Sequence, residues 1–420
     1  MLQRLSLLPL ESLAKTSGFV RRRPRKLSLE AFAQSILLSL CQPSYSLATW
    51  AAQLSALQAG LFSKQALHRR CGPALVNFLQ LCLSTLLGRW MGRDCPAQVL
   101  HHFGRLLVQD STALKLHRSL ASHFPACGNQ NQSALAGVRI QAIFDLRSQS
   151  WIHFELGAFN DNDQQASALI LSHLRSGDLV IRDLGYAAFK VWRQIAARGA
   201  YFLSRWRNDF RLFDPKTQQP LELLSLLSRR PQLSLEVLLG SQERLPVRLV
   251  ALRLPAPLAA QRRRRARANA RRDRALRLSA RYLKLLDWTI LLTNVTSEQL
   301  NAQQLLETYA CRWQIEMLFK SWKSHFQLGR LPISSPRQVQ IQLLVKLLAI
   351  TLVQNSFAPQ PYVSVSRPLS PLKIAAYFSR LLPLIAASPH QNWSDHFSYF
   401  CRYDSRPNRA NFFEKLSSLL

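Results

Sequence analysis

The chain has 420 residues, of which 48% are hydrophobic, so it can bury a large core and form two or three domains. Lysine and arginine number 55 against 23 acidic residues, and the formal net charge is +32 at pH 7. This excess indicates a polyanionic partner, because a basic surface binds phosphate backbones by releasing condensed counterions. A membrane partner is disfavoured, since neither a long apolar span nor a basic amphipathic helix stands out.

The N-terminus and the cysteines indicate where the protein works. The first 26 residues lack the order of charge, apolar stretch and small-residue cleavage site that defines a secretory signal, so we expect a cytoplasmic protein. The seven cysteines form no CxxC pair and no Cys/His spacing typical of structural zinc. We expect them to be reduced and mostly buried.

Residues 1–103 are expected to form a helical N-terminal DNA-binding domain. Between Leu27 and Arg93 apolar residues recur at helical spacing. Residues 46–70 resemble two short helices around Gly60, with Ser63 as the N-cap of a basic second helix. This is the pattern of a helix-turn-helix, although a purely structural helical hairpin has the same pattern.

Residues 104–208 are expected to contain short strands rich in Val, Ile, Phe and Tyr. These strands are expected at 105–112, 138–147, 151–157, 178–186 and 200–206. Helical stretches are expected at 161–177 and 188–199. The order of these elements predicts an α/β fold, an open mixed sheet covered by helices. Asp110 and Asp183 fall at the ends of two expected strands, where ligands gather in such sheets.

Residues 209–286 interrupt the alternation and are expected to be an insertion rich in β-structure and arginine. Residues 233–255 predict a hairpin that turns near Gly240 and Ser241. An arginine run follows at 261–281, and it is either a solvated face or a DNA-binding surface. So concentrated a positive block repels itself unless a polyanion neutralises it, so we favour contact with DNA phosphates rather than bases.

Residues 287–334 are expected to return to the first domain, with a strand at 287–295 and one long helix at 297–329. A capping-box pattern of Thr296 and Gln299 marks the expected helix start. Residues 335–420 return to helical spacing and are expected to form a helical C-terminal region.

The long helix carries five polar side chains within an arc of roughly 80° at about 100° per residue, and these are Tyr309, Arg312, Glu316, Lys320 and Lys323. An ordinary amphipathic helix with its charges in water has the same pattern. Cleavage of a DNA phosphodiester by two Mg²⁺ ions needs carboxylate oxygens, and Asp110, Asp183 and Glu316 could supply them. Spacing alone does not separate the two aspartates from their competitors, which are Asp145, Asp161, Asp163 and Asp178.

Three segments resemble one known family. Tyr309, Arg312, Glu316 and Lys323 match the Tyr-Arg-Glu-Lys signature of the fourth family of bacterial insertion-sequence transposases. The first catalytic aspartate of that family precedes Ser-Thr, as Asp110 does, and the second lies in a strand before Gly-Tyr or Gly-Phe, as Asp183 does. The resemblance spans nearly the whole chain and is sharp at these segments.

The resemblance implies a ribonuclease H-like catalytic domain with a mostly β insertion before the glutamate. It implies a triad of Asp110, Asp183 and Glu316 that binds two Mg²⁺ ions, with Mn²⁺ as a substitute. In family members the triad activates water to nick DNA, and the freed 3′-OH attacks the other strand to form a hairpin. The implied partners are the terminal inverted repeats of the element, target DNA and a second copy of the chain in a homodimer, in the cytoplasm at the bacterial nucleoid.

The resemblance also assigns DNA-binding side chains. Tyr309, Arg312 and Lys323 would hold phosphates near the transposon end, and we expect Lys320 on the same face to join them. Related enzymes stack a flipped base on a tryptophan, and Trp288 occupies a similar place before the signature helix. A tryptophan in a strand is also a common core residue, and Trp313 is a weaker candidate for stacking.

Two alternative functions use the same features. A DNA-binding protein derived from a transposase would keep the basic surface without the chemistry, but the three matched carboxylates argue against it. A sequence-tolerant nuclease would use the same triad without joining strands, and a target plasmid would reveal this difference.

Overall fold

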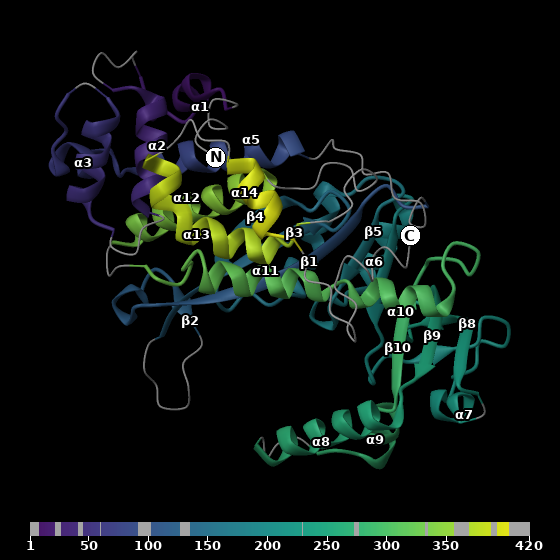
Figure 1. Ribbon diagram of the computed structural model, residues 1–420. Helices are drawn as coiled ribbons and strands as arrows, with labels where there is room; N and C mark the ends of the chain where they lie inside the picture. Colours follow the sequence, from purple (N-terminus) through teal and green to yellow (C-terminus); the bar gives the residue numbers. More distant parts are fainter. Residues whose placement is uncertain are drawn as a thin grey trace. The chain divides into compact units, whose positions relative to one another are not determined.

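A computed structural model describes residues 8–21, 27–40, 45–58, 60–90, 102–126, 135–228, 230–272, 277–331, 335–356, 369–387 and 393–402 (Figure 1). Contacts between residues divide them into two compact units. The first unit takes the described residues of 1–97, 110–161 and 313–413, and the second those of 98–109 and 162–312. The five-part division expected from the sequence stays a prediction.

The N-terminal part of the first unit is helical, as expected. Its helices are α1 (Leu10–Thr16), α2 (Leu29–Leu40), α3 (Leu47–Leu57), α4 (Lys64–Arg70) and α5 (Pro73–Trp90). Ser63 is the N-cap of α4, because its hydroxyl accepts a hydrogen bond of 3.2 Å from the backbone N–H of Ala66. Gly60, between α3 and α4, has φ +128°, a conformation that favours glycine.

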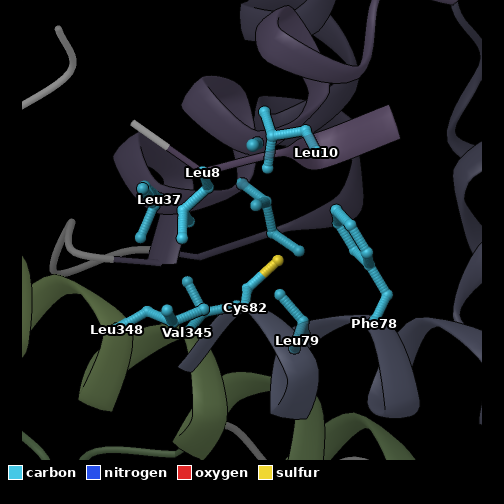
Figure 2. A pocket seen from close by; sticks show the side chains of 10 residues that line it. Leu8, Leu10, Leu37, Phe78, Leu79, Cys82, Val345 and Leu348 are labelled. Atoms are coloured by element: carbon cyan, nitrogen blue, oxygen red, sulfur yellow. The ribbon is translucent and has the colours of Figure 1, made fainter. Parts of the chain in front are cut away.

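Apolar side chains hold these helices to a C-terminal helix of the same unit, α12 (Pro336–Ser356). Figure 2 shows a small apolar cavity where α1, α2, α5 and α12 meet, lined by Leu10, Leu37, Phe78, Cys82 and Leu348 among others. Burial raises the pKa of the Cys82 thiol to about 12, so this cysteine behaves as a small apolar residue. The other helices of this region are α13 (Pro371–Ala387) and α14 (Trp393–Phe400).

The cysteine expectation holds where the structure describes the chain. Cys71, Cys82, Cys311 and Cys401 are free thiols, and all but Cys71 are buried. Cys41, Cys95 and Cys127 lie outside the described residues.

The first unit also contains antiparallel strands. Its strands are β2 (Pro125–Ala126), β3 (Leu135–Asp145) and β4 (Ser150–Ala158), with a short 3₁₀ turn η2 (Arg118–Leu120) before them. Strand β3 pairs antiparallel with β4 and with β2, and it neighbours β1 (Leu106–Leu116) on its other side. The helix α11 (Trp313–Ser324) belongs to this unit as well.

The second unit takes the first residues of β1 and builds a sheet outward from them. Its further elements are η3 (Gln165–His173), β5 (Leu179–Arg182), η4 (Leu184–Tyr186), α6 (Phe189–Ala197), β6 (Tyr201–Arg205), β7 (Leu212–Phe213), α7 (Leu223–Leu227), β8 (Gln232–Leu239), β9 (Leu245–Arg253), α8 (Ala256–Arg272), α9 (Ala280–Leu285), β10 (Trp288–Thr293) and α10 (Ala302–Ala310). Strands β1, β5 and β6 run parallel, and β6, β10, β9, β8 and β7 continue in antiparallel order.

The strand order confirms the ribonuclease H-like sheet. The order through β1 is β4, β3, β1, β5, β6, in which an antiparallel pair is followed by strands parallel to β1. The expected hairpin of the insertion is β8 and β9, and Gly240 at its turn has φ +86°. The inserted segment also contains the helices α7, α8 and α9.

Two helix predictions were wrong. Residues 165–173 form 3₁₀ turns rather than an α-helix. The helix expected at 297–329 is two helices, α10 and α11, because i→i−3 bonds tighten the chain at Cys311 and Arg312 and end α10 there. The capping box that begins α10 consists of Asn301 and Gln304, and not of the expected Thr296 and Gln299.

In the described chain no helix alone combines the length and apolar character needed to cross a membrane. The pair α4 and α5, bent by 72°, meets both criteria together.

Candidate active site

Strands β1 and β5 bring the segments before the two expected catalytic aspartates into register. Gln109 on β1 is the Cα partner of Arg182 on β5. Asp110 follows Gln109, and Asp183 follows Arg182 as the first residue beyond β5. The expectation that Asp183 ends a strand is confirmed. Asp110 instead lies within β1, because this strand continues past the end of β5 alongside β3.

Arg182 is fully buried under this edge of the second unit. Its Nη1 donates hydrogen bonds to Gln109 Oε1 at 3.3 Å and to the Ser167 carbonyl and hydroxyl at 2.9 Å each. Burial lowers the pKa of Arg182 to about 10, and Tyr186 opposes this shift. The guanidinium therefore keeps its charge at neutral pH, in the core directly before Asp183.

A tyrosine and two arginines lie together in the second unit. Tyr309, in the last turn of α10, is buried, and the Cζ atoms of Arg205 and Arg312 lie 6.0 and 5.9 Å from the centre of its ring. Burial raises the pKa of Tyr309 to about 12; Asp183 adds to the shift, and the two arginines oppose it. The phenol therefore stays neutral and can donate a hydrogen bond beside two guanidinium groups.

Trp288 begins β10 and is buried, with 8% of its surface exposed. Its carbonyl accepts a hydrogen bond of 3.1 Å from Arg262 Nη1. The side chain lies in the core of the second unit, the alternative that a strand tryptophan suggested. Its expected role in stacking a base stays a prediction.

Asp110 is half-buried in the first unit and has polar neighbours on its own sheet. Its Oδ1 accepts a hydrogen bond of 2.8 Å from the backbone N–H of Ser111. The Ser111 hydroxyl in turn accepts one of 3.1 Å from Arg139 Nη1 on β3. This chain of contacts holds the backbone beside Asp110 against the neighbouring strand.

Aromatic packing positions the helix that carries Glu316. Trp322 of α11 lies 4.7 Å from Trp151 and 5.4 Å from Phe154 between ring centres, and both partners are on β4. Phe319 adds a stacked contact with Trp151. Glu316, in the first turn of α11, is half-buried on this anchored helix.

The exposed face of α11 carries the expected basic residues Lys320 and Lys323. Lys320 Nζ lies 4.9 Å from the ring centre of Trp313, an aromatic side chain that is 45% exposed. Because α10 and α11 are separate helices, the five polar residues do not lie on one continuous helix. Tyr309 and Arg312 belong to the second unit, and the other three belong to the first.

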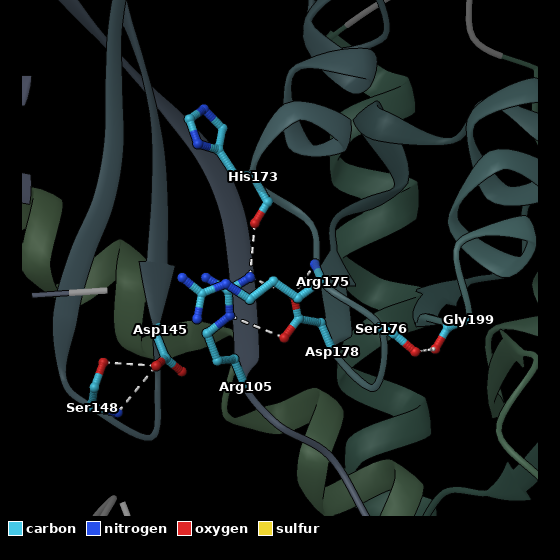
Figure 3. A network of polar contacts seen from close by, with 8 residues as sticks. All are labelled: Arg105, Asp145, Ser148, His173, Arg175, Ser176, Asp178 and Gly199. Carbon is cyan, nitrogen blue, oxygen red and sulfur yellow. Dashed lines mark hydrogen bonds and ion pairs between the residues drawn. The ribbon is translucent and has the colours of Figure 1, made fainter. Parts of the chain in front are cut away.

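Three competing aspartates have structural partners instead, as Figure 3 shows for two of them. Asp178 is buried in an ion pair of 2.5 Å with Arg105, whose Nη2 also donates to the His173 carbonyl. Asp145 accepts a hydrogen bond of 2.7 Å from the Ser148 hydroxyl in the turn between β3 and β4. Asp161 accepts one from the Ala158 backbone N–H. These roles are those of turn and core residues.

Within the described ranges, no group of three or more His, Cys, Asp or Glu side chains is arranged to hold a metal ion. Asp110 and Glu316 lie in the first unit and Asp183 in the second. Their shared role as a triad stays a prediction.

Sequence reasoning missed Arg205 as a candidate. The register pairs Ile181 with Leu203, so Asp183 and Arg205, each two residues later, stand at equivalent positions where two neighbouring parallel strands end. Arg205 ends its strand, and the rule that selected Asp183 could have found it. The bond between Gln109 and Arg182 was also missed, because an arginine and a glutamine in two strands carry no signal of their own.

Comparisons with known proteins bear on this arrangement. Residues 101–352 match the family model described as the transposase DDE domain. The transposase for insertion sequence element IS231B of Bacillus thuringiensis subsp. berliner is 29% identical over 371 residues, covering 83% of this chain and 76% of that protein. The transposase for insertion sequence element IS1151 of Clostridium perfringens is 21% identical over 364 residues, with coverages of 82% and 76%.

A solved structure of a piggyBac transposase synaptic complex with hairpin DNA aligns with 96% of this chain and 83% of that chain, at 10% identity and a TM-score of 0.39. The assignment rests on the sequence comparisons, since the family model covers more than half of the chain. The chain belongs to the family of transposases that share the DDE domain.

Proposed function

We propose that this transposase cuts and rejoins DNA with Asp110, Asp183 and Glu316 as its catalytic carboxylates. The observation that carries the proposal is the pairing of Gln109 with Arg182. Each aspartate follows one of these paired residues, at the edge of parallel strands where ligands gather in α/β sheets. The family match spans all three carboxylates, since residues 101–352 include them.

The donor set fits a hard divalent cation. All three side chains are carboxylates with part of their surface exposed, and carboxylate oxygens are the ligands that Mg²⁺ prefers. We propose that they hold two Mg²⁺ ions, with Mn²⁺ as a substitute. When bound, such ions activate a nucleophile and stabilise negative charge on the phosphate.

Cationic side chains near the carboxylates would bind the DNA backbone. Arg205 and Arg312 flank the neutral Tyr309 in the second unit, and together they form a site for a phosphate with one hydroxyl and two guanidinium donors. Lys320 and Lys323 offer further positive charge on the exposed face of α11. We also propose that Trp288 stacks on a flipped base. Because Trp288 is buried, the chain around it must open locally before a base can reach the ring.

We propose that the substrate is duplex DNA that carries the element's terminal inverted repeats, and that two copies of the chain pair two ends before insertion into target DNA. Work on chromosomal DNA implies a cytoplasmic protein at the nucleoid. The net charge of +32 supports a DNA partner, because so basic a chain gains from counterion release on binding.

The test uses the full chain and a DNA fragment that includes the sequences flanking its coding region. We expect cleavage that requires Mg²⁺ in the wild type and is lost in Glu316→Gln. The matched control is Glu307→Gln on α10, also half-buried, which should cleave normally. Equal cleavage by the wild type and Glu316→Gln would remove Glu316 from the mechanism. Cleavage without joined products on a target plasmid would indicate a nuclease rather than a strand-joining enzyme.

A further inference from the structure

Helix α8 concentrates positive charge on a part of the chain that the proposed catalytic chemistry does not use. Its 17 residues carry seven arginines and no acidic residue. Figure 1 shows α8 beyond the end of the β9–β10 pair, where α9 leads into β10. Ala259 is its buried residue, and most of the helix surface is open to solvent.

The arginines of α8 divide into two groups. The first two tether the helix to the start of β10: Arg262 donates hydrogen bonds to the Trp288 carbonyl at 3.1 Å and the Thr289 hydroxyl at 3.2 Å, and Arg263 forms an ion pair with Asp287. The other five are exposed, and these are Arg264, Arg265, Arg267, Arg271 and Arg272.

Among the described residues, the acidic side chains near α8 do not neutralise the exposed group. Asp287 is paired with Arg263, and Glu222 lies 3.3 Å from Arg281 of α9. None of the five exposed side chains forms an ion pair or side-chain hydrogen bond with another residue in the described part of the chain. Like charges three or four residues apart destabilise a helix by a few tenths of a kcal/mol per pair, roughly. The helix therefore bears a repulsion that an anionic partner would relieve.

The spacing of the exposed arginines suits a row of phosphates. Arg264, Arg267 and Arg271 fall within an arc of about 60° and span about 10 Å along the helix. Arg265 and Arg272 form a neighbouring row. Alanines stand among these arginines in the sequence of the helix, and Leu258 near its start is a single exposed large apolar side chain, so α8 lacks the bulky apolar face that a membrane-binding helix requires.

We propose that the exposed arginines of α8, with Arg264, Arg267 and Arg271 as the leading row, bind the phosphate backbone of duplex DNA without reading its sequence. The two tethering arginines fix the helix, and the exposed row holds DNA during the reaction. Guanidinium groups suit this role because each donates several hydrogen bonds to phosphate oxygens. The proposal rests on DNA as the substrate of the chain and is independent of the carboxylate triad.

The experiment measures binding of the full chain to labelled duplexes by fluorescence anisotropy over a range of KCl concentrations. EDTA is present, so cleavage does not occur and failure of the triad proposal would not affect the result. One duplex carries the terminal repeats and one has a scrambled sequence. The test variant is Arg264→Gln/Arg267→Gln/Arg271→Gln. The matched control, Lys190→Gln/Arg211→Gln/Lys216→Gln, removes three exposed cations elsewhere in the same unit.

We expect the test variant to reduce the slope of log K against log salt by about 2 to 3, since each lost phosphate contact changes it by about 0.9. The reduction should be equal on both duplexes. The control should change the slope by less than one such contact. The corresponding triple lysine variant should restore the slope, because charge is retained. Unchanged melting temperatures would show that all variants fold.

Three results would overturn the proposal. Equal slope losses in the test and control variants would mean that the effect comes from the net charge of the chain and not from the position of the arginines on α8. A loss confined to the terminal-repeat duplex would mean that α8 reads bases. An unchanged DNA slope, with lost binding to duplex RNA or to anionic phosphatidylserine vesicles, would assign the helix to a different polyanion.

Discussion

Arg182 donates a hydrogen bond of 3.3 Å to Gln109, and the two residues are paired across β5 and β1. The bond joins the two strands one residue before Asp183 and Asp110. Arg182 Nη1 is buried and donates to Gln109 and Ser167 instead of to water. Burial strengthens the hydrogen bond, because charge interactions are less screened inside the protein. The pair thereby links the stability of the sheet to the position of the proposed carboxylates.

Replacement of Arg182 by Gln should destabilise the protein strongly. The variant loses charged hydrogen bonds and leaves the Ser167 carbonyl and Gln109 amide poorly satisfied, which costs about 2 to 3 kcal/mol of unfolding free energy. Chemical denaturation followed by circular dichroism measures the loss. Arg193→Gln, an exposed arginine with one hydrogen bond to the Glu243 carbonyl, serves as the control and should cost less than about 0.5 kcal/mol. Equal losses would show that burial of Arg182 contributes little.

Two substitutions of Trp322 should show that aromatic packing, and not the polar indole N–H, holds α11 in place. Trp322→Ala removes a fully buried side chain from the cluster with Trp151 and Phe154 and should cost about 3 to 5 kcal/mol. Trp322→Phe should cost much less, because it keeps an aromatic ring and removes an indole N–H that is buried without a partner among the described residues. DNA cleavage should follow the same order, since the cluster holds the helix of Glu316. Full activity in a folded Trp322→Ala protein would contradict this link.

His153 on β4 should make the protein less stable in mild acid. Burial lowers the pKa of His153 below its ordinary value of 6.5, so the unfolded chain takes up a proton at this site more readily than the folded chain. Its contribution to stability is therefore complete above about pH 6.5 and is lost as the pH falls through the folded pKa. The unfolding free energy of His153→Gln, measured at several pH values between 5 and 7.5, should depend less on pH than that of the wild type. The same pH dependence in both proteins would contradict the assignment.

The elements with strong local signals could be predicted from the sequence. The β8–β9 hairpin follows from alternating apolar residues and the glycine at 240, and α4 begins at the expected cap, Ser63. The strand before Asp183 was also predicted, because a run of Leu, Val and Ile ends there. These features depend on residues close together in the chain.

The features that could not be predicted depend on distant partners. The division into α10 and α11 has no glycine or proline to mark it, and the i→i−3 bonds at Cys311 and Arg312 become visible only in the structure. Strand β1 passes Asp110 because a separate strand, β3, lies beside it. The competing aspartates could be separated from the candidates only by their partners, such as Arg105 for Asp178.

The central claim is that three carboxylates from distant parts of the chain bind the same divalent ions. The most direct measurement is Mn²⁺ binding to the DNA-bound chain by electron paramagnetic resonance, in the wild type and in Asp110→Asn, Asp183→Asn and Glu316→Gln. Asp209→Asn, which changes an exposed aspartate paired with Arg207, is the control. We predict tight binding in the wild type and control, and weakened binding in each of the three variants. Unchanged Mn²⁺ affinity in any of the three would contradict the shared site.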